Sequence, residues 1–169
     1  MQENEIYLRA SKWGMKMEEV KAIEKAQISG EDKSAILYTG KLSDYCCSIV
    51  YIFVNNKLCR SKYILNDEYS NDAKYLANYA AIADLLKAKY GAPSTEQEIV
   101  LDYDGIEDKA MAIKTGKLGL ITKWNREDSC DGIILSGDNY IFNLTIEYIC
   151  ESLKDEEDDA RRQAALDDL

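Results

Sequence analysis

The stretch Ser70–Pro93, SNDAKYLANYAAIADLLKAKYGAP, decides the fold, because it has the clearest helical pattern in the chain. Large apolar residues recur there every three or four positions and form one stripe along a helix. They are Tyr75, Tyr79, Ile82, Leu86 and Tyr90, with Leu76, Ala83 and Leu85 widening the stripe. Ser70 or Asn71 can cap the start, Gly91 can take the left-handed closing conformation, and Pro93 cannot continue the helix. We therefore expect a long central helix over residues 71–90, packed on one face of a sheet.

The residues before this helix predict a first group of strands. The stretch Tyr45–Val54 is apolar on both faces, which is typical of a strand covered on two sides in the middle of a sheet. Asn55-Asn56 tolerates positive φ at both positions, as a tight hairpin turn requires. The expected elements are a helix over Met15–Lys25, a loop over Gln27–Lys33 and strands over Ala35–Leu42, Tyr45–Val54 and Leu58–Leu65.

The residues after the helix repeat this order. Tyr140–Tyr148 alternates apolar and polar side chains, as a half-buried strand does. The expected elements are a short extension over Glu98–Tyr103, a helix over Ile106–Thr115 and strands over Leu118–Trp124, Gly132–Ser136 and Tyr140–Tyr148. Two α-β-β-β units predict an α+β fold with an antiparallel sheet of about six strands. Residues 1–169 then form a single domain, with halves over 13–69 and 70–150 and an acidic helix or tail over 151–169.

Charge narrows the range of partners. The formal net charge is −10, and residues 151–169 carry eight acids against three bases. Phosphate backbones and anionic lipid headgroups do not attract such a chain, so we expect no nucleic acid partner and no membrane binding by charge. A protein partner, and in particular a basic one, fits the charge. The tail has two readings: a solvated, loosely docked helix that raises solubility, or a docking element for a basic partner.

The cysteine content and the first residues of the chain indicate the cellular compartment in which we expect the protein. Five cysteines make an odd count without CxxC spacing, which predicts reduced thiols used as small apolar residues. No apolar run is long enough to span a membrane, and MQENEIYLRA lacks the pattern of a secretion signal. The chain as it stands reads as cytoplasmic. The alternative is an exported or lipid-anchored protein whose signal has been removed.

The chain offers little for catalysis. Histidine is absent, which removes the commonest general base and the commonest metal ligand. Asp102 and Asp104 are spaced like the opening of a calcium loop, but Gly105 comes too early and Met111 stands where a glutamate is needed. This stretch therefore reads as a plain Asp-Gly turn. We expect no catalytic residues, no cofactor and no metal.

The two tryptophans are the candidate partner-binding residues. Trp13 precedes the first expected helix, and Trp124 closes a strand of the second half. Both can simply fill the ends of the core. In the functional reading, one of them is an exposed anchor for a partner.

Motifs spread over residues 13–148 carry a family resemblance. They are Trp13-Gly14-Met15, Glu18-Glu19-Val20, Glu24, Tyr51, Phe53, Asn56-Lys57-Leu58, Lys89-Tyr90-Gly91, Pro93, Trp124, Gly137-Asp138-Asn139 and Ile146–Tyr148. In this order they resemble a widespread group of small uncharacterised bacterial proteins, many of which look like exported lipoproteins. The resemblance implies the helix-plus-sheet repeat of the β-lactamase-inhibitor protein and of small outer-membrane assembly lipoproteins. It also implies protein binding without an active site. We therefore expect a non-catalytic protein-binding module; the alternative is a small-molecule or peptide binder that uses the open sheet face.

Overall fold

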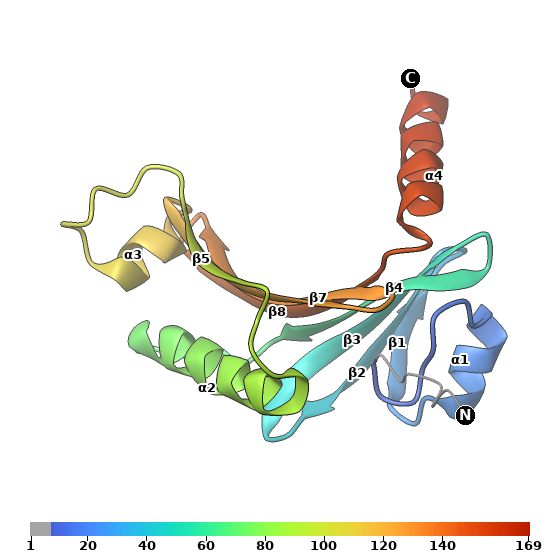
Figure 1. Cartoon of the computed structure of the whole chain (residues 1–169), viewed down its shortest axis with the longest axis horizontal. Coiled ribbons are helices and arrows are strands. Elements are labelled where there is room, and N and C mark those ends of the chain that lie inside the picture. The colour runs from blue at the N-terminus through green and yellow to red at the C-terminus, as the bar shows by residue number, and fades with distance from the viewer. Residues whose placement is uncertain (1–7) are drawn as a thin grey trace.

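The computed structural model describes residues 8–169. Over these residues the chain has an α+β fold with one curved antiparallel sheet and four helices (Figure 1). The strands are β1 (Gln27–Glu31), β2 (Ala35–Leu42), β3 (Tyr45–Val54), β4 (Lys57–Leu65), β5 (Thr95–Val100), β6 (Leu118–Arg126), β7 (Ser129–Asp138) and β8 (Ile141–Cys150). The helices are α1 (Met17–Ile23), α2 (Ala73–Tyr90), α3 (Lys109–Lys114) and α4 (Lys154–Asp167).

Two four-stranded meanders make up the sheet. The strand order is β1-β2-β3-β4-β8-β7-β6-β5, so β4 and β8 meet at the centre. At this seam, Arg60–Ile64 of β4 lies opposite Thr145–Ile149 of β8. Each half therefore contributes one continuous meander, and a single ladder joins them.

The sheet has eight strands, so the expectation of about six is wrong. Strand β1 occupies most of the stretch expected to be a loop, and β5 begins before the expected extension. Both are edge strands, and every residue of β1 is exposed. A strand that buries neither face has no alternation of polar and apolar residues, so the pattern that predicts strands is missing there.

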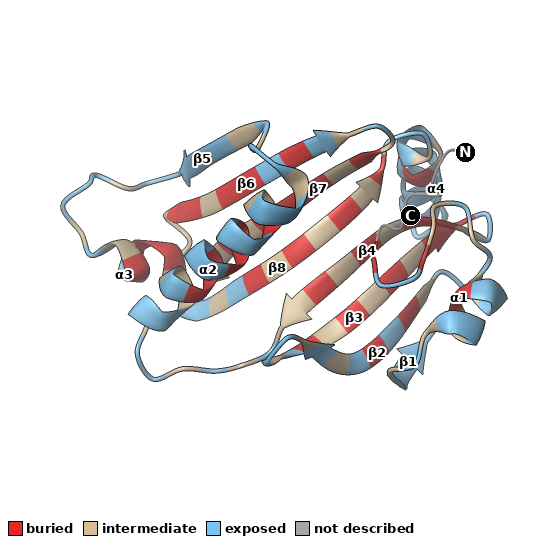
Figure 2. Cartoon of the chain, turned by 60° about the horizontal axis from the view of Figure 1, so that its bottom comes forward, coloured by how far each residue is buried: buried red, intermediate tan, exposed pale blue. Residues whose placement is uncertain are grey.

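One face of the sheet carries the core. Figure 2 shows α1, α2 and α3 on the near side of the sheet, with buried residues alternating along the central strands. On α2 the expected stripe is buried at Tyr79, Ile82 and Leu86, but Leu85 is 64% exposed and does not widen it. The single long central helix is also a wrong expectation, because α2 packs mainly across β7 and β8 and shares the covered face with the other two helices.

The ends of α2 follow the sequence closely. Gly91 has a φ of 84°, and its N–H donates to the Lys87 carbonyl at 2.8 Å. At the other end, the Asn71 side chain accepts a hydrogen bond from the Ala73 N–H at 3.1 Å. Gly91 ends the helix with the positive φ that glycine allows, but its ψ of −159° differs from the left-handed closing conformation that the sequence predicts. The helix begins at Ala73, two residues later than expected.

The opposite face of the sheet is open. We define the open face by its apolar centre, which consists of Val50, Ile52, Ile64, Ile134 and Ile149, all half-buried. Because α1, α2 and α3 lie on the other side and α4 contacts this face of β3 only near its Val54 end, the expectation that Tyr45–Val54 is covered twice is wrong for most of the strand. Cys46 on this side of β3 is exposed, whereas Cys47, which faces the helices, is buried.

Helix α4 projects from the side of the sheet opposite α2 (Figure 1). Its apolar face is as thin as the sequence indicates, and Ala160 and Ala164 are exposed. The first turn is nevertheless anchored. Glu157 is buried and accepts a hydrogen bond from Arg60 Nε at 2.9 Å, while Glu156 pairs with Lys57 Nζ at 3.0 Å. The first turn of α4 is therefore attached to the sheet by charged side chains, and the rest of the helix projects away from the sheet.

Candidate functional site

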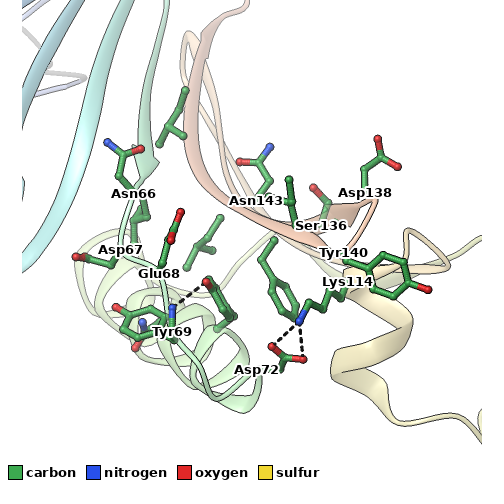
Figure 3. A pocket seen from close by; sticks show the side chains of 18 of the residues that line it. Asn66, Asp67, Glu68, Tyr69, Asp72, Lys114, Ser136, Asp138, Tyr140 and Asn143 are labelled. Carbon is green, nitrogen blue, oxygen red and sulfur yellow. Dashed lines mark hydrogen bonds and ion pairs between the residues drawn. The ribbon is translucent and has the colours of Figure 1, made fainter.

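A cleft opens where β4 and β8 separate. Their ladder ends at the Ile64–Thr145 pair, and beyond it the chain leaves the sheet along Asn66–Tyr69 toward α2. The first residues of β8, Ile141–Leu144, line the other side, followed by the β7–β8 turn. The cleft has a volume of about 870 Å³ and opens to solvent (Figure 3). It is larger than a second hollow beside Leu86 and Tyr148, whose volume is about 210 Å³.

Acidic side chains dominate the charge of the cleft. Four carboxylates line it (Asp67, Glu68, Asp72 and Asp138), against the single ammonium of Lys114. Two of the four are already engaged: Asp67 accepts a hydrogen bond from the Cys46 N–H, and Asp72 pairs with Lys114 Nζ at 3.0 Å. Glu68 and Asp138 are exposed and form no ion pair within residues 8–169. They leave two uncompensated negative charges on opposite sides of the cleft.

Aromatic rings form the floor of the cleft. Tyr75 of α2 and Phe142 of β8 stack with their ring centroids 4.2 Å apart and their planes 17° apart. Tyr69 meets Tyr75 edge-to-face at 5.1 Å, and its backbone N–H donates to the Tyr75 hydroxyl at 3.0 Å. The rings thus hold one another in place and tie the loop after β4 to α2.

The rim at the β7–β8 turn has an unusual backbone. Asn139 and Tyr140 have positive φ values of 48° and 66°, in a hairpin position that glycine or asparagine normally occupies. A bulky side chain rarely adopts this conformation, because its Cβ crowds the backbone. Tyr140 is 63% exposed, so burial of its ring does not offset this cost. Backbone strain of this kind is concentrated at functional sites.

Close packing holds this turn on α3. A side chain at Gly137 would meet the Ile113 carbonyl oxygen at 2.2 Å, so only glycine lets the two backbones touch there. The Tyr140 N–H also donates to the Lys114 carbonyl at 3.1 Å. The rim that carries Asp138 and Tyr140 is therefore fixed to a neighbouring helix.

The cleft has two chemically different levels. In Figure 3, Glu68 and Asp138 point away from α2, whereas the Asp72–Lys114 pair lies beside that helix. Phe142 shares its side of β8 with the buried Leu144, so its ring faces the helices. The part of the cleft next to the helices is thus lined by aromatic rings, and the part next to the open face is lined by acidic side chains. We call these two parts the aromatic level and the acidic level.

The two candidate tryptophans lie outside this cleft. Trp124 is 2% exposed, and its indole Nε1–H donates to the Gly91 carbonyl at 2.9 Å, so its ring packs in the core. Trp13 is half-buried and packs against the core of the first half. Trp124 has almost no surface to offer a partner, and the anchor role stays a prediction for Trp13.

Sequence reasoning missed the cleft residues, although a signal for them exists. Asp67-Glu68-Tyr69 and Asp138-Asn139-Tyr140 each place at least one acid before a tyrosine at or just beyond the end of a strand. The sequence indicates turns at such places, but it does not show that the two turns face each other. The Asp-Gly turn expected at Asp104 is present, and the Asp104 carboxylate accepts hydrogen bonds from the N–H groups of Ile106 and Glu107. These bonds hold the pKa of Asp104 below its usual value.

Comparisons with known proteins give no relative. No family model matches the chain, and searches of curated proteins and of solved structures also return no match. Within residues 8–169, the helices are all too short or too polar to cross a bilayer.

Proposed function

We propose that this protein is a non-catalytic protein-binding module whose partner presents a basic surface to the cleft. The observation that carries the proposal is the pairing of two uncompensated carboxylates, Glu68 and Asp138, with a floor of aromatic rings. Lysine and arginine side chains bind carboxylates, and they also bind the faces of aromatic rings. The same chemistry suits a protein of net charge −10, which attracts basic partners over long range.

Two further features support this proposal. The cleft adjoins the open face, whose half-buried isoleucines and valine offer an apolar surface next to the charged one. Interfaces commonly combine such an apolar centre with a polar rim. The motif resemblance to the β-lactamase-inhibitor-like repeat also favours protein binding, since proteins with that repeat act by binding other proteins.

A second candidate is the binding of a small cationic molecule or a free peptide. The cleft volume of about 870 Å³ falls within the range of ligand pockets. Aromatic rings beside carboxylates are also the usual surroundings of a bound ammonium group. In this reading the occupant is a metabolite or peptide, and the open face takes no part or only a minor one.

Affinity capture from the native host, with gentle cross-linking, tests the proposal. The bait is the whole protein, compared with the double variant Glu68→Lys, Asp138→Lys. The matched control is Asp84→Lys, Asp158→Lys, which changes the net charge equally at two exposed positions outside the cleft. We expect a basic protein with the wild type and the control, and its loss with the cleft variant and at high salt. Equal recovery with all three baits would contradict the proposal. A metabolite without any protein would favour the second candidate.

A further inference from the structure

We propose that the cleft receives an extended basic segment of the partner, which adds a strand to the free edge of β8. This proposal rests on the proposed function, and it names both the kind of partner segment and how it binds. Three observations carry it: an unpaired strand edge inside the cleft, two levels of different chemistry, and an unprotected sequence along that edge.

The free edge follows from the register of the sheet. Ile141–Leu144 pair with Leu135–Asp138 of β7 on one side. On the other side β4 has already ended, because its last pair with β8 is Ile64 with Thr145. In an antiparallel ladder every second residue directs its N–H and C=O toward a given neighbour. Alternate residues of Ile141–Leu144 therefore direct backbone donors and acceptors into the cleft, where an incoming strand can pair with them.

The outer edges of the sheet are protected in ways that this inner edge is not. Strand β1 has a break in register between Ile28 and Gly30, which disrupts pairing with another chain. Strand β5 carries Glu96 and Glu98, which are ion-paired with Lys87 of α2 and Lys109 of α3, so a strand added there would have to bury charged side chains. The inner edge, Ile141-Phe142-Asn143-Leu144, has neither charge nor proline. It is thus the edge best suited to accept a strand.

The two levels of the cleft specify the side chains of the added strand. Side chains of a strand point alternately to opposite faces of the sheet. One set would lie on the Tyr75–Phe142 rings, which favours apolar or aromatic residues. The other set would lie between Glu68 and Asp138, which favours lysine or arginine. The cleft therefore matches a segment in which basic and apolar residues alternate.

The rim supplies a further contact. Tyr140 is held at a positive φ of 66° with its ring exposed beside the mouth of the cleft. An aromatic ring in this position can cover one end of an added strand and stack on a basic side chain. This contact gives the strained turn a role that packing within the protein does not provide.

A capped peptide of about six residues, in which lysine and valine alternate, is the probe for the edge. Its affinity for the full chain is measured by titration, together with two versions N-methylated at all valine or at all lysine amides. Because lysine and valine alternate, each version lacks the backbone N–H donors on one side of the strand only. We expect the two methylated peptides to differ about tenfold or more in affinity, because one of them loses the bonds to β8. Hydrogen exchange should slow at alternate amides of Ile141–Leu144 when the unmodified peptide binds.

The charge variants complete the test. Glu68→Lys with Asp138→Lys should weaken binding of the unmodified peptide about tenfold, while Asp84→Lys with Asp158→Lys should leave it unchanged. If all three peptides bind alike, or if no basic peptide binds, strand addition is overturned. Capture of a basic protein that depends on the cleft would then still uphold the proposed function. If capture also fails, the proposed function fails as well.

Discussion

Glu24 shows how one side chain connects several elements of the first half. Its side chain is 2% exposed, and its carboxylate accepts hydrogen bonds from the Tyr51 hydroxyl at 2.6 Å and from the Ala26 N–H at 2.9 Å. Arg9 lies 2.9 Å away as its counter-ion. Burial opposes ionisation, but the bonds from Tyr51 and Ala26 and the charge of Arg9 outweigh it and hold the pKa of Glu24 below its usual value.

Replacement of Tyr51 tests this network. Tyr51→Phe should cost about 2 kcal/mol of unfolding free energy at neutral pH, since a hydrogen bond to a buried carboxylate is lost. Because the pKa of Glu24 is lower in the folded than in the unfolded state, its stabilisation is present above the unfolded pKa and disappears as the pH falls through the folded pKa. Urea unfolding at pH 7 and at about pH 3 measures the difference, which should shrink in acid. Tyr140→Phe, at an exposed hydroxyl, is the control; equal losses for Tyr51→Phe at both pH values would contradict the account.

The cysteines should differ sharply in reactivity. All five are free, and Cys46 is exposed, whereas burial raises the pKa of the Cys59 thiol to about 12. The thiolate is the reactive form, so Cys46 should react first with a thiol reagent at neutral pH and Cys59 only on unfolding. Cys46→Ser should remove the fast phase. Fast modification of Cys59 in the native protein would show that β4 opens more readily than its packing indicates.

At the scale of elements, α4 divides into an anchored and a free part. The bonds of Glu156 and Glu157 to Lys57 and Arg60 lie in its first turn, whereas Gln163 and the exposed last residues form hydrogen bonds within their own helix. Truncation after Arg162 should change the unfolding free energy by less than about 0.5 kcal/mol. Truncation after Leu153 should lower the unfolding free energy by about 1 to 3 kcal/mol, because Arg60 loses one of its partners. Thermal and urea unfolding of the two truncated proteins decide this, and equal stabilities would show that the anchor contributes nothing.

The elements predicted from sequence were those that bury one face. Strands β2 and β3 match the expected residues, and both asparagines of the turn at Asn55 have positive φ as predicted. The missed strand β1 lies at an edge, where solvent on both sides leaves no periodic signal. The cleft could not be predicted for a different reason. It depends on Ile64 and Thr145 ending one ladder, and the pairing of residues so far apart is set by tertiary packing rather than by local pattern.

At the scale of the whole molecule, Arg60 joins the two halves and α4. Its guanidinium binds Glu147 of β8 and Glu157 of α4, and all three side chains are largely buried. Arg60→Ala should therefore lower the unfolding free energy by about 3 kcal/mol, because the carboxylates of Glu147 and Glu157 lose their buried partner and keep, among the described residues, only Lys62 and Arg161. Arg161→Ala is a matched control, since Arg161 also binds Glu157 but its side chain is 63% exposed. This variant should lower the unfolding free energy by less than about 1 kcal/mol. Urea unfolding of both variants measures the contrast, and a similar small loss for both would show that the seam does not depend on this cluster.

The seam between β4 and β8 also governs how the chain folds. The other strand pairs of each meander are close in sequence, whereas Arg60 and Glu147 are 87 positions apart. Closing a loop of that length costs entropy before the new contacts form, so we expect seam formation to be the slow step of folding. Substitutions in the seam should slow folding, whereas those at β1 or β5 should mainly speed unfolding. During synthesis β8 emerges late, and until then the inner edge of β4 stays unpaired and available to chaperones.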